Sequence, residues 1–473
     1  MTPKSRPLLT ALALLTACLS TAASAQATPT TGGTAPALAA PGLVARALVA
    51  PGLVAPGLAA PAPASPGRSA GARMASARTA RSQEDPARAH LGQAGTGPVG
   101  RAHAASVSAR AIPRCMSSVP YVSGRGGYAT YRIPAVVRTR LGTVLAFAEG
   151  RRHGAADTGD IDVVLRRSTD GGCTWGPLTV VAAGDGDTRG NPAPVVDPRT
   201  GAVVLVTCAN GGKATEDQIR RGAGDRRVFV QRSGDDGRHF TPPADITAQV
   251  KRPGWRWYAT GPGHAIALTR GPHAGRLLVP ANHSVAAPAG SPGPASRYDG
   301  GHALYSDDGG HTWHLGFVTG PHGGVTNVNE TTAAQLPDGR LYFNARDQYG
   351  TAPGNRLDTY SSDGGTTLDR PYTVQPTLNA VPVVQGSLLQ LGGRKVPLLF
   401  SAPSVPTARR ALALWSSRDS GRTFTRERTL SNHPAAYSDL VQLGPGTVGV
   451  LYETGNKRAY DTVEFRRLTL PGS

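Results

Sequence analysis

The stretch STDGGCTW, Ser168–Trp175, recurs in related form four more times along the chain. The shared pattern is Ser-x-Asp-x-Gly, usually followed by Thr and an aromatic residue. The other copies are SGDDGRHF (Ser233–Phe240), SDDGGHTW (Ser306–Trp313), SSDGGTTL (Ser361–Leu368) and SRDSGRTF (Ser417–Phe424). Successive copies start 65, 73, 55 and 56 residues apart. Repetition at this spacing is typical of folds built from stacked or radially arranged units.

Each of these five segments, the Asp boxes, has the residue types of a hairpin turn. Ser and Asp side chains hydrogen-bond backbone groups within turns, and Gly permits a backbone conformation that a Cβ disfavours. Flanking segments such as Ile161–Arg167, Arg227–Gln231 and Thr447–Tyr452 alternate in polarity like half-buried strands. Units of this length with several strands predict an all-β fold, a β-propeller. We interpret the Asp boxes as structural turns rather than as ligand sites.

The first 25 residues have the features of an export signal. A positively charged start precedes an apolar run at residues 8–17, and Ala23–Ala25 forms a small-residue cleavage site. The apolar run is too short to cross a bilayer, so we predict secretion and no transmembrane segment. The alternative is a lipid anchor on Cys18, because Leu15–Cys18 resembles the cleavage box of bacterial lipoproteins.

Residues 26–111 are rich in Ala, Pro, Gly, Ser and Arg. This composition lacks the aromatic and branched residues that offset chain entropy, so we predict a disordered linker. Residues 112–473 are then long enough for one six-bladed propeller. Its sixth blade has no Asp box, and we expect it to be closed by strands from both ends of the chain, with Val463–Leu468 beside the segment after Cys115.

Cysteine count and charge exclude several classes of function. If Cys18 is removed or lipidated, then Cys115, Cys173 and Cys208 remain, which allows at most one disulfide and leaves one thiol free. No metal-ligand spacing and no P-loop occur, so we expect no cofactor and no metal. The net charge of +19 indicates a solvated surface that also attracts anionic glycans. No nucleic-acid-binding module is found, so nucleic acid is not an expected partner.

Longer motifs around the Asp boxes resemble those of the bacterial exo-sialidases, the neuraminidases that release terminal sialic acid. The resemblance begins with YATYRIPAVV (Tyr128–Val137), which contains an Arg-Ile-Pro motif. It continues in order through WYATGPGHAI, VNETTAAQLPDGRLYFNARD, SAPSVPTARRALALWSSRDSG and AYSDLVQLGPGTVGVLYETG, and spans roughly residues 115–470. The resemblance implies a six-bladed sialidase-like propeller.

The substrate of such enzymes explains the arginines in these motifs. Sialic acid carries a carboxylate on its anomeric carbon, and the planar fork of Arg donates two parallel hydrogen bonds to such a group. Sialidases use three arginines for this purpose. The resemblance places them on Arg132, Arg346 and Arg409, with Arg410 as the alternative to Arg409.

The nucleophile of sialidases is a tyrosine rather than a carboxylate. A carboxylate nucleophile would be repelled by the carboxylate that the anomeric carbon already bears. A neutral phenol avoids this repulsion but needs a base to activate it. The resemblance places the nucleophile on Tyr437 and the base on Glu330.

The general acid of the family lies on a loop before a strand that begins Gly-Asp-Ile. It protonates the leaving glycosidic oxygen and later deprotonates water. The resemblance places this acid on Asp157. Asp160 and Asp162 are the rival assignments, but we expect both to form hydrogen bonds at the start of the strand instead.

Two further residues support the predicted site. The resemblance implies that Glu453 pairs with the first arginine and fixes its orientation. It also implies that Arg151 contacts substrate, with Arg152 as the alternative. Trp255 and Trp257 are interpreted as core residues and are not assigned to a substrate pocket.

The sequence therefore predicts a secreted, monomeric exo-α-sialidase that acts on sialylated glycans without a cofactor. One alternative is a trans-sialidase, which shares these residues and differs in having an acceptor site. The other alternative is a non-catalytic propeller that binds sialoglycans. Such a binding protein would need the arginines but not Asp157, Glu330 and Tyr437, whose presence favours an enzyme.

Overall fold

The computed structural model describes residues 115–290, 297–321, 324–393 and 396–470. These residues all belong to one compact unit, residues 103–473. The predicted export signal, the predicted linker and Cys18 lie outside the described residues. Within the described part of the chain, no helix is long and apolar enough to cross a membrane.

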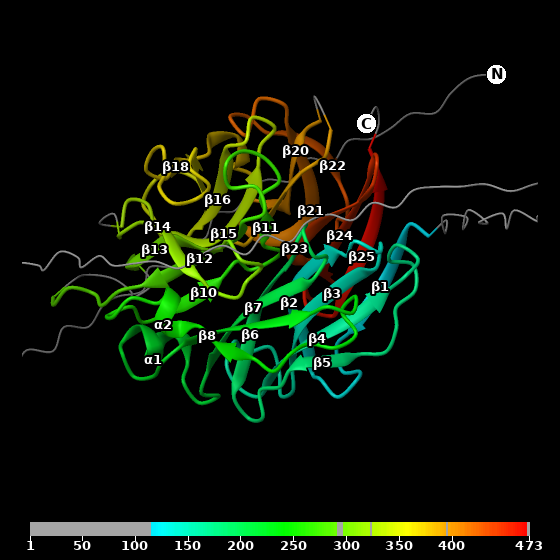
Figure 1. Ribbon diagram of the computed structural model, residues 1–473, viewed down its shortest axis with the longest axis horizontal. Coiled ribbons are helices and arrows are strands. Elements are labelled where there is room, and N and C mark those ends of the chain that lie inside the picture. The colour runs from blue at the N-terminus through cyan, green and yellow to red at the C-terminus, as the bar shows by residue number, and fades with distance from the viewer. Residues whose placement is uncertain (1–114, 291–296, 322–323, 394–395, 471–473) are drawn as a thin grey trace, which may run out of the picture. The chain divides into compact units, whose positions relative to one another are not determined.

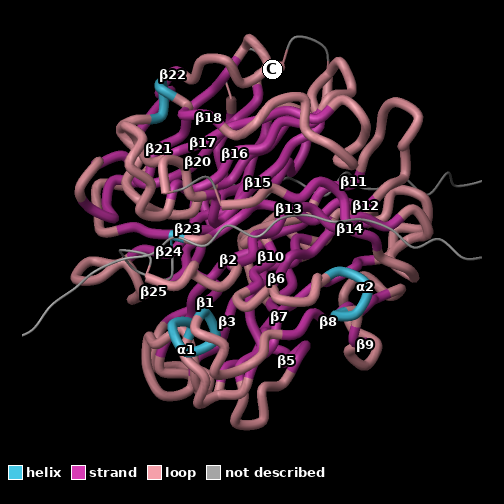
Figure 2. The backbone as a smooth tube through the Cα atoms, turned by 90° about the vertical axis from the view of Figure 1, so that its left-hand side faces the viewer, coloured by secondary structure: helices cyan, strands magenta, loops and turns pink. Residues whose placement is uncertain are grey.

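Strands make up nearly all the regular structure (Figure 2). The helices among the described residues are short: α1 (Glu216–Arg220), α2 (Thr247–Val250) and the 3₁₀-helix η2 (Pro376–Leu378). The strands predicted around Ile161, Arg227 and Thr447 are all present. The prediction of an all-β, propeller-like fold is confirmed.

The strands form five hydrogen-bonded sheets (Figure 1). The largest sheet joins two antiparallel groups through a single parallel bridge between Ile161 and Thr188. The first group is β2 (Thr130–Arg138), β3 (Val144–Arg151), β4 (Ile161–Ser168) and β5 (Thr179–Ala182). The second group is β6 (Thr188–Val196), β7 (Val203–Asn210), β8 (Arg227–Ser233) and β9 (Ala244–Asp245).

The other four sheets repeat the same antiparallel arrangement. The third group is β10 (Tyr258–Thr260), β11 (Ile266–Ala267), β12 (Leu277–Ser284), β13 (Asp299–Ser306) and β14 (His314–Val318). The fourth is β15 (Val328–Gln335), β16 (Leu341–Asp347), β17 (Arg356–Ser361) and β18 (Thr373–Val374). The fifth is β19 (Ser387–Gln390), β20 (Leu398–Val405), β21 (Ala408–Ser417) and β22 (Thr425–Thr429). The last is β23 (Ala435–Gly444), β24 (Thr447–Thr454), β25 (Thr462–Thr469) and β1 (Ser117–Val122).

Hydrophobic clusters lie between successive groups and arrange them in a ring. One cluster packs β6, β7 and β8 against β12 and β13, and the next packs the third group against the fourth. The cluster that contains Tyr121, Val136 and Phe465 packs the last group against the first. Because the last group contacts the first, the apolar face of every group is covered by a neighbour.

Both ends of the described chain meet in one sheet. β1 pairs antiparallel with β25, so that Ser117 lies opposite Arg466 and Val122 lies opposite Thr462. Figure 1 shows the first strand, in cyan, beside the last strand, in red. The predicted closure by strands from both ends is confirmed. It also explains the missing sixth Asp box, because the fourth strand of this sheet is β1 and no turn from β25 is needed.

The five Asp boxes connect the third strand of a group to the fourth. In the first box the Ser168 hydroxyl donates to Asp170 (2.7 Å) and accepts from the backbone N–H of Gly172 (2.8 Å). The same two contacts occur in the other four boxes. Gly172 has a φ of 90°, a conformation that favours glycine. The boxes are structural turns, and all five lie at the edge of the sheets that we call the box edge.

The Cys115–Cys173 disulfide ties the start of the described chain to the first Asp box. Cys208 is a free, buried thiol on β7. The sequence predicted at most one disulfide and one free thiol among Cys115, Cys173 and Cys208, and the structure has both. The sequence did not show which two cysteines pair.

A single carboxylate connects four inner segments of the ring. Asp439 on β23 is 1% exposed. Its carboxylate accepts the backbone N–H groups of Val136 (2.8 Å) and His264 (2.9 Å) and the Ser387 hydroxyl (2.7 Å), and it lies 2.7 Å from Nδ1 of His264. Burial lowers the pKa of His264, but Asp439 outweighs burial and the net pKa is raised above its usual value.

We expect the variant His264→Asn to lower thermal stability most at about pH 6. Because the folded-state pKa of His264 is raised, its charge contributes stability that is complete below the unfolded pKa of about 6.5 and is lost as pH rises through the folded value. Thermal unfolding followed by circular dichroism between about pH 5 and 9 measures the difference from wild type. A difference that does not shrink toward high pH would show that His264 is neutral in the folded protein.

Candidate active site

Four innermost strands carry the same irregularity at the edge opposite the box edge. In each, the innermost strand advances three residues while its partner advances two, as in a β-bulge. The shifts lie between Arg132 and Ala135 on β2, Gly190 and Ala193 on β6, Val328 and Thr331 on β15, and Ala435 and Ser438 on β23. The extra residue turns a side chain out of the regular alternation and toward the axis of the ring.

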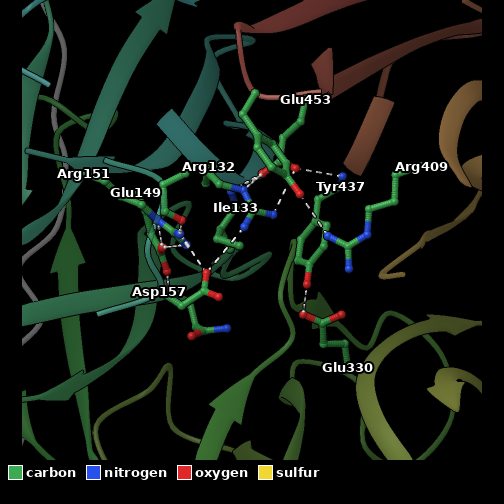
Figure 3. A network of polar contacts seen from close by, with 12 residues as sticks. Arg132, Ile133, Glu149, Arg151, Asp157, Glu330, Arg409, Tyr437 and Glu453 are labelled. Carbon is green, nitrogen blue, oxygen red and sulfur yellow. Dashed lines mark hydrogen bonds and ion pairs between the residues drawn. The ribbon is translucent and has the colours of Figure 1, made fainter. Parts of the chain in front are cut away.

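The bulges place predicted site residues around one cavity. The cavity has a volume of about 220 Å³. Its lining includes Arg132 and Ile133 from the β2 bulge, Asn191 from β6, Glu330 from β15 and Tyr437 from β23. Arg151, Asp157, Arg346 and Arg409 complete the set of predicted residues at this cavity. Figure 3 shows Arg132, Asp157, Glu330, Arg409 and Tyr437 directed toward one another.

Arg132 is held in place by Glu453, a buried residue on β24. Nε and Nη2 of Arg132 donate to the two oxygens of Glu453, at 3.1 and 3.2 Å. The same carboxylate accepts the backbone N–H groups of Ile133 (2.8 Å) and Tyr437 (3.1 Å). Glu453 therefore fixes a guanidinium and two bulges together, and its attraction raises the pKa of Arg132 against the effect of burial.

The backbone of Ile133 adopts an unfavourable conformation at this point. Its φ of 57° is in the left-handed region, which is rare for a β-branched residue. Asn191, in the corresponding bulge of β6, has a φ of 52°. Its N–H donates to Glu149 of β3 (2.9 Å), as that of Ile133 donates to Glu453. A carboxylate on the preceding group thus holds each strained bulge.

Tyr437 and Glu330 form a hydrogen-bonded pair. The Tyr437 hydroxyl donates to Glu330, and Nη1 of Arg346 donates to Glu330 (2.9 Å) and to the hydroxyl oxygen (3.3 Å). Burial and then Glu330 raise the pKa of Tyr437, and three arginines only partly oppose this. The phenol is therefore neutral at physiological pH and already hydrogen-bonded to the carboxylate of Glu330.

Arg409 reaches the cavity from β21. Its Nη1 donates to the Tyr460 hydroxyl (3.1 Å) and its Nη2 to the Val383 carbonyl (3.4 Å). Among the described residues it has no carboxylate within ion-pair distance. Arg410 is exposed and donates to the Asn432 carbonyl. The structure therefore places Arg409, and not Arg410, at the cavity.

Asp157 lies at the rim, with its side chain 63% exposed. It forms an ion pair with Arg151 at 2.7 Å and with Arg132 at 3.4 Å. Partial desolvation by the surrounding protein raises the pKa of Asp157, but Arg151 and then Arg132 outweigh it, and the net pKa is lowered. Arg151 is itself held by Glu149 at 2.6 Å.

The rival residues lie outside the cavity. Asp162 is buried and accepts from the Tyr128 hydroxyl (2.6 Å), from the Gly184 N–H (2.7 Å) and from Arg152 (2.7 Å). Asp160 forms an ion pair with Arg152 at 3.3 Å. These contacts are the strand-end interactions that we expected for both carboxylates.

Metal binding is not indicated by the side chains in the described ranges. No group of three or more His, Cys, Asp or Glu residues there is arranged to hold a metal ion.

Comparisons with known proteins identify the family of this chain. Residues 142–450 match the family model described as a BNR repeat-like domain. The chain is 30% identical over 389 residues to an exo-alpha-sialidase of Aspergillus fumigatus, which covers 75% of this chain and 87% of that protein. The chain belongs to the sialidase family.

A second relative and a solved structure are also similar to most of this chain. A sialidase of Micromonospora viridifaciens is 33% identical over 397 residues, which are 79% of this chain and 58% of that protein. Among solved structures, the Hadza microbial sialidase Hz136 superimposes with a TM-score of 0.63 and 26% identity, over 75% of this chain and 68% of that chain. Both matches cover at least three quarters of this chain.

The sequence did not reveal one wall of the cavity of this sialidase family member. Asn191, Glu216, Arg226, Trp257 and Asn282 line it. Trp257 was interpreted as a core residue, and it does pack on the Arg226 guanidinium, 3.9 Å from the ring centroid, but it also faces the cavity. Trp255 is a core residue stacked on a histidine ring. One local feature of the sequence could have indicated this wall: an Asn-Pro pair follows Gly190 in the same way as an Ile-Pro pair follows Arg132.

We expect Glu453→Gln to impair both stability and sialoside cleavage. A glutamine has one acceptor oxygen and directs an NH₂ group at N–H donors that Glu453 now satisfies. Loss of a buried charge partner costs about 3 kcal/mol or more, and misplacing Arg132 should lower kcat/KM about 100-fold. Thermal unfolding and hydrolysis of a fluorogenic sialoside measure the two effects. Full activity in this variant would show that Arg132 does not need Glu453.

Proposed function

We propose that this protein is an exo-α-sialidase that hydrolyses terminal sialic acids with retention, through a covalent sialyl-tyrosine intermediate. The observation that carries the proposal is the meeting of Arg132, Arg346 and Arg409 with the Tyr437–Glu330 pair at one cavity. A glycan-binding protein would have no need for a hydroxyl paired with a base. The names of the relatives support the same activity.

The three arginines would clamp the carboxylate of the sugar. Arg132 and Arg346 are each paired with a carboxylate, whereas Arg409 has only a hydroxyl, a carbonyl and an aromatic ring as neighbours. A bound anion would give Arg409 the negatively charged partner that no carboxylate of the described chain supplies. Because Glu453 and Glu330 already fix the orientation of the Arg132 and Arg346 guanidinium groups, these side chains lose little conformational entropy when a ligand binds.

Tyr437 would attack the anomeric carbon. Its phenol is neutral, so it approaches a carbon beside a carboxylate without like-charge repulsion. Glu330 is placed to take the phenolic proton as the bond forms, since the hydroxyl already donates to it. Arg346 contacts both partners and stabilises negative charge on either oxygen.

Asp157 would protonate the leaving oxygen and then activate water. Desolvation raises the pKa of Asp157, but the attraction of Arg151 and then of Arg132 outweighs it and lowers the net pKa. A substrate carboxylate at Arg132 reduces that attraction and adds a like charge, so both effects raise the pKa of Asp157 on binding. Two displacements at the same carbon give net retention.

We further propose that the ring is a six-bladed propeller. The two antiparallel groups of the largest sheet share only one bridge, and each has its own Asp box, so they count as separate blades. Export from the cell, with a lipid anchor on Cys18 as the alternative, remains our proposal from the N-terminal sequence.

We expect Tyr437→Phe to lower kcat/KM on the order of 10³-fold. The variant keeps the ring but removes the nucleophilic oxygen. Hydrolysis of α2,3-, α2,6- and α2,8-linked sialosides, with NMR detection of the first-formed anomer, measures rate and stereochemistry together. Tyr360→Phe is the matched control, because its hydroxyl donates to Ser420 in an Asp box. Addition of excess lactose tests transfer: sialyl-lactose in excess of free sialic acid would identify a trans-sialidase instead.

We expect the effect of Asp157→Ala to depend on the leaving group. A sugar leaving group needs protonation, so kcat/KM for sialyl-lactose should fall about 10³-fold. An aryl leaving group departs as a stabilised anion, so the loss on an aryl sialoside should be about 10-fold or less. In wild type, kcat for sialyl-lactose, which reports ionisations in the substrate complex, should fall as pH rises through the pKa that Asp157 has in that complex, and Asp157→Ala should lack this limb. Equal losses on both substrates would exclude Asp157 as the acid.

A further inference from the structure

Two side-chain amides of the described chain that line the cavity, those of Asn282 and Gln348, have a buried atom without a hydrogen-bond partner, and in Asn282 both the nitrogen and the oxygen lack one. Asn282 on β12 is 0% exposed and lines the cavity. Among the described residues, neither its Nδ2 nor its Oδ1 has a partner. Buried side-chain amides in proteins are nearly always hydrogen-bonded, and an unpaired one lowers stability. Asn282 therefore calls for an explanation other than the stability of the fold.

Arg226, Asn329 and Glu216, which line the cavity with Asn282, already form hydrogen bonds. Nε of Arg226 donates to the Tyr258 carbonyl (2.6 Å) and its Nη2 to Oδ1 of Asn191 (2.5 Å). Nδ2 of Asn329 donates to Asp299 (2.8 Å). Glu216 accepts from Arg220 (2.8 Å). Asn282 differs from these residues because both ends of its amide are left for a ligand in the cavity.

The position of Asn282 indicates which part of a sugar it would meet. Asn282 belongs to the third group of strands and Tyr437 to the last, so the two face each other across the ring. A sialic acid with its anomeric carbon at Tyr437 and its carboxylate at the arginines directs the far side of its pyranose toward Asn282. The far side carries an N-acylamino group at C5 and a glycerol chain at C6, and each offers a donor and an acceptor.

We propose that Asn282 is a specificity-determining residue that binds this donor-and-acceptor pair on the sugar. The inference rests on the proposed function, since it uses the orientation that Tyr437 and the arginines impose. An amide oxygen of Asn282 accepts from the N–H or O–H of the sugar, and its NH₂ group donates to the neighbouring oxygen. A site built to hydrogen-bond such a group rejects analogues that lack it, because its buried polar atoms are then unpaired.

Three aryl α-sialosides test the proposal: the N-acetyl sugar, its 5-hydroxy analogue and an analogue whose glycerol chain is shortened to C7. We expect wild type to lose about 10- to 100-fold in kcat/KM on one of the two analogues. We expect Asn282→Leu to have a kcat/KM for the N-acetyl sugar that is lower than that of wild type by the same factor. On the analogue that wild type cleaves poorly, the variant and wild type should have equal kcat/KM. The analogue concerned identifies the N-acylamino group or the glycerol chain as the ligand of Asn282.

Thermal unfolding separates recognition from packing. Removal of an unpaired buried amide should leave the Tm of Asn282→Leu equal to or above that of wild type while activity falls. Asn282→Ala serves the same purpose if leucine does not fit. Gln390→Leu is the matched control, because this amide is on β19 outside the cavity and donates to backbone carbonyls. Equal loss by Asn282→Leu on all three substrates, no loss on any, or a fall in Tm that accompanies the fall in activity would overturn the proposal.

Binding of free N-acetyl sialic acid and of the two free analogue sugars, measured by calorimetry, keeps this test separate from that of the proposed function. If wild type cleaves no sialoside but Asn282→Leu weakens binding with the selectivity described above, the hydrolase is wrong and the role of Asn282 stands. If wild type cleaves sialosides and Asn282→Leu shows no selectivity, the role of Asn282 is wrong and the hydrolase stands. If wild type neither binds nor cleaves, both are wrong.

Discussion

Several arginine side chains face one small cavity, and their positive charges repel one another. Carboxylates beside the cavity compensate most of these charges. Arg132 is compensated by Glu453, Arg151 by Glu149 and Arg346 by Glu330. Each carboxylate also does a second task, since it holds a bulge or contacts a phenol. The arginines are thereby fixed in orientation before any ligand arrives, and the charge of Arg409 stays available to an anion.

The same local solution is repeated around the ring. An extra residue in an innermost strand exposes a functional side chain, and a carboxylate from the preceding group accepts the strained N–H. Since the framework of each group is set by its hairpins, and in the first five groups also by an Asp box, the bulges can distort one edge without disturbing the other. The boxes close the turns at the opposite edge, and the bulged edge carries the side chains that line the cavity.

Much of this arrangement was predictable from the sequence, for identifiable reasons. The Asp boxes are local patterns that encode turns, and they indicated both the repeat and its strand content. The site residues came from motifs in a family resemblance, and the structure brings Arg132, Arg346 and Arg409 to one cavity. The contacts that organise them were not predictable, because the Arg132–Glu453 pair joins residues 321 positions apart. The disulfide pair, the carboxylate of Asp439 and the unpaired amide of Asn282 likewise depend on the closed ring and have no local signature.

The pairing of β1 with β25 means that the ring can close only after the last strand has been synthesised. β1 is among the first strands of the ring to be synthesised, yet its partner is the last strand of the chain. Until β25 is made, β1 has no partner in its own sheet and the ring is open at that seam. Long-range pairing of this kind carries a large loop-closure cost and is slow to form. The ring therefore cannot close before β25 is synthesised, and a polypeptide that stops short of β25 leaves the edges of β1 and β24 exposed and available for association with other chains.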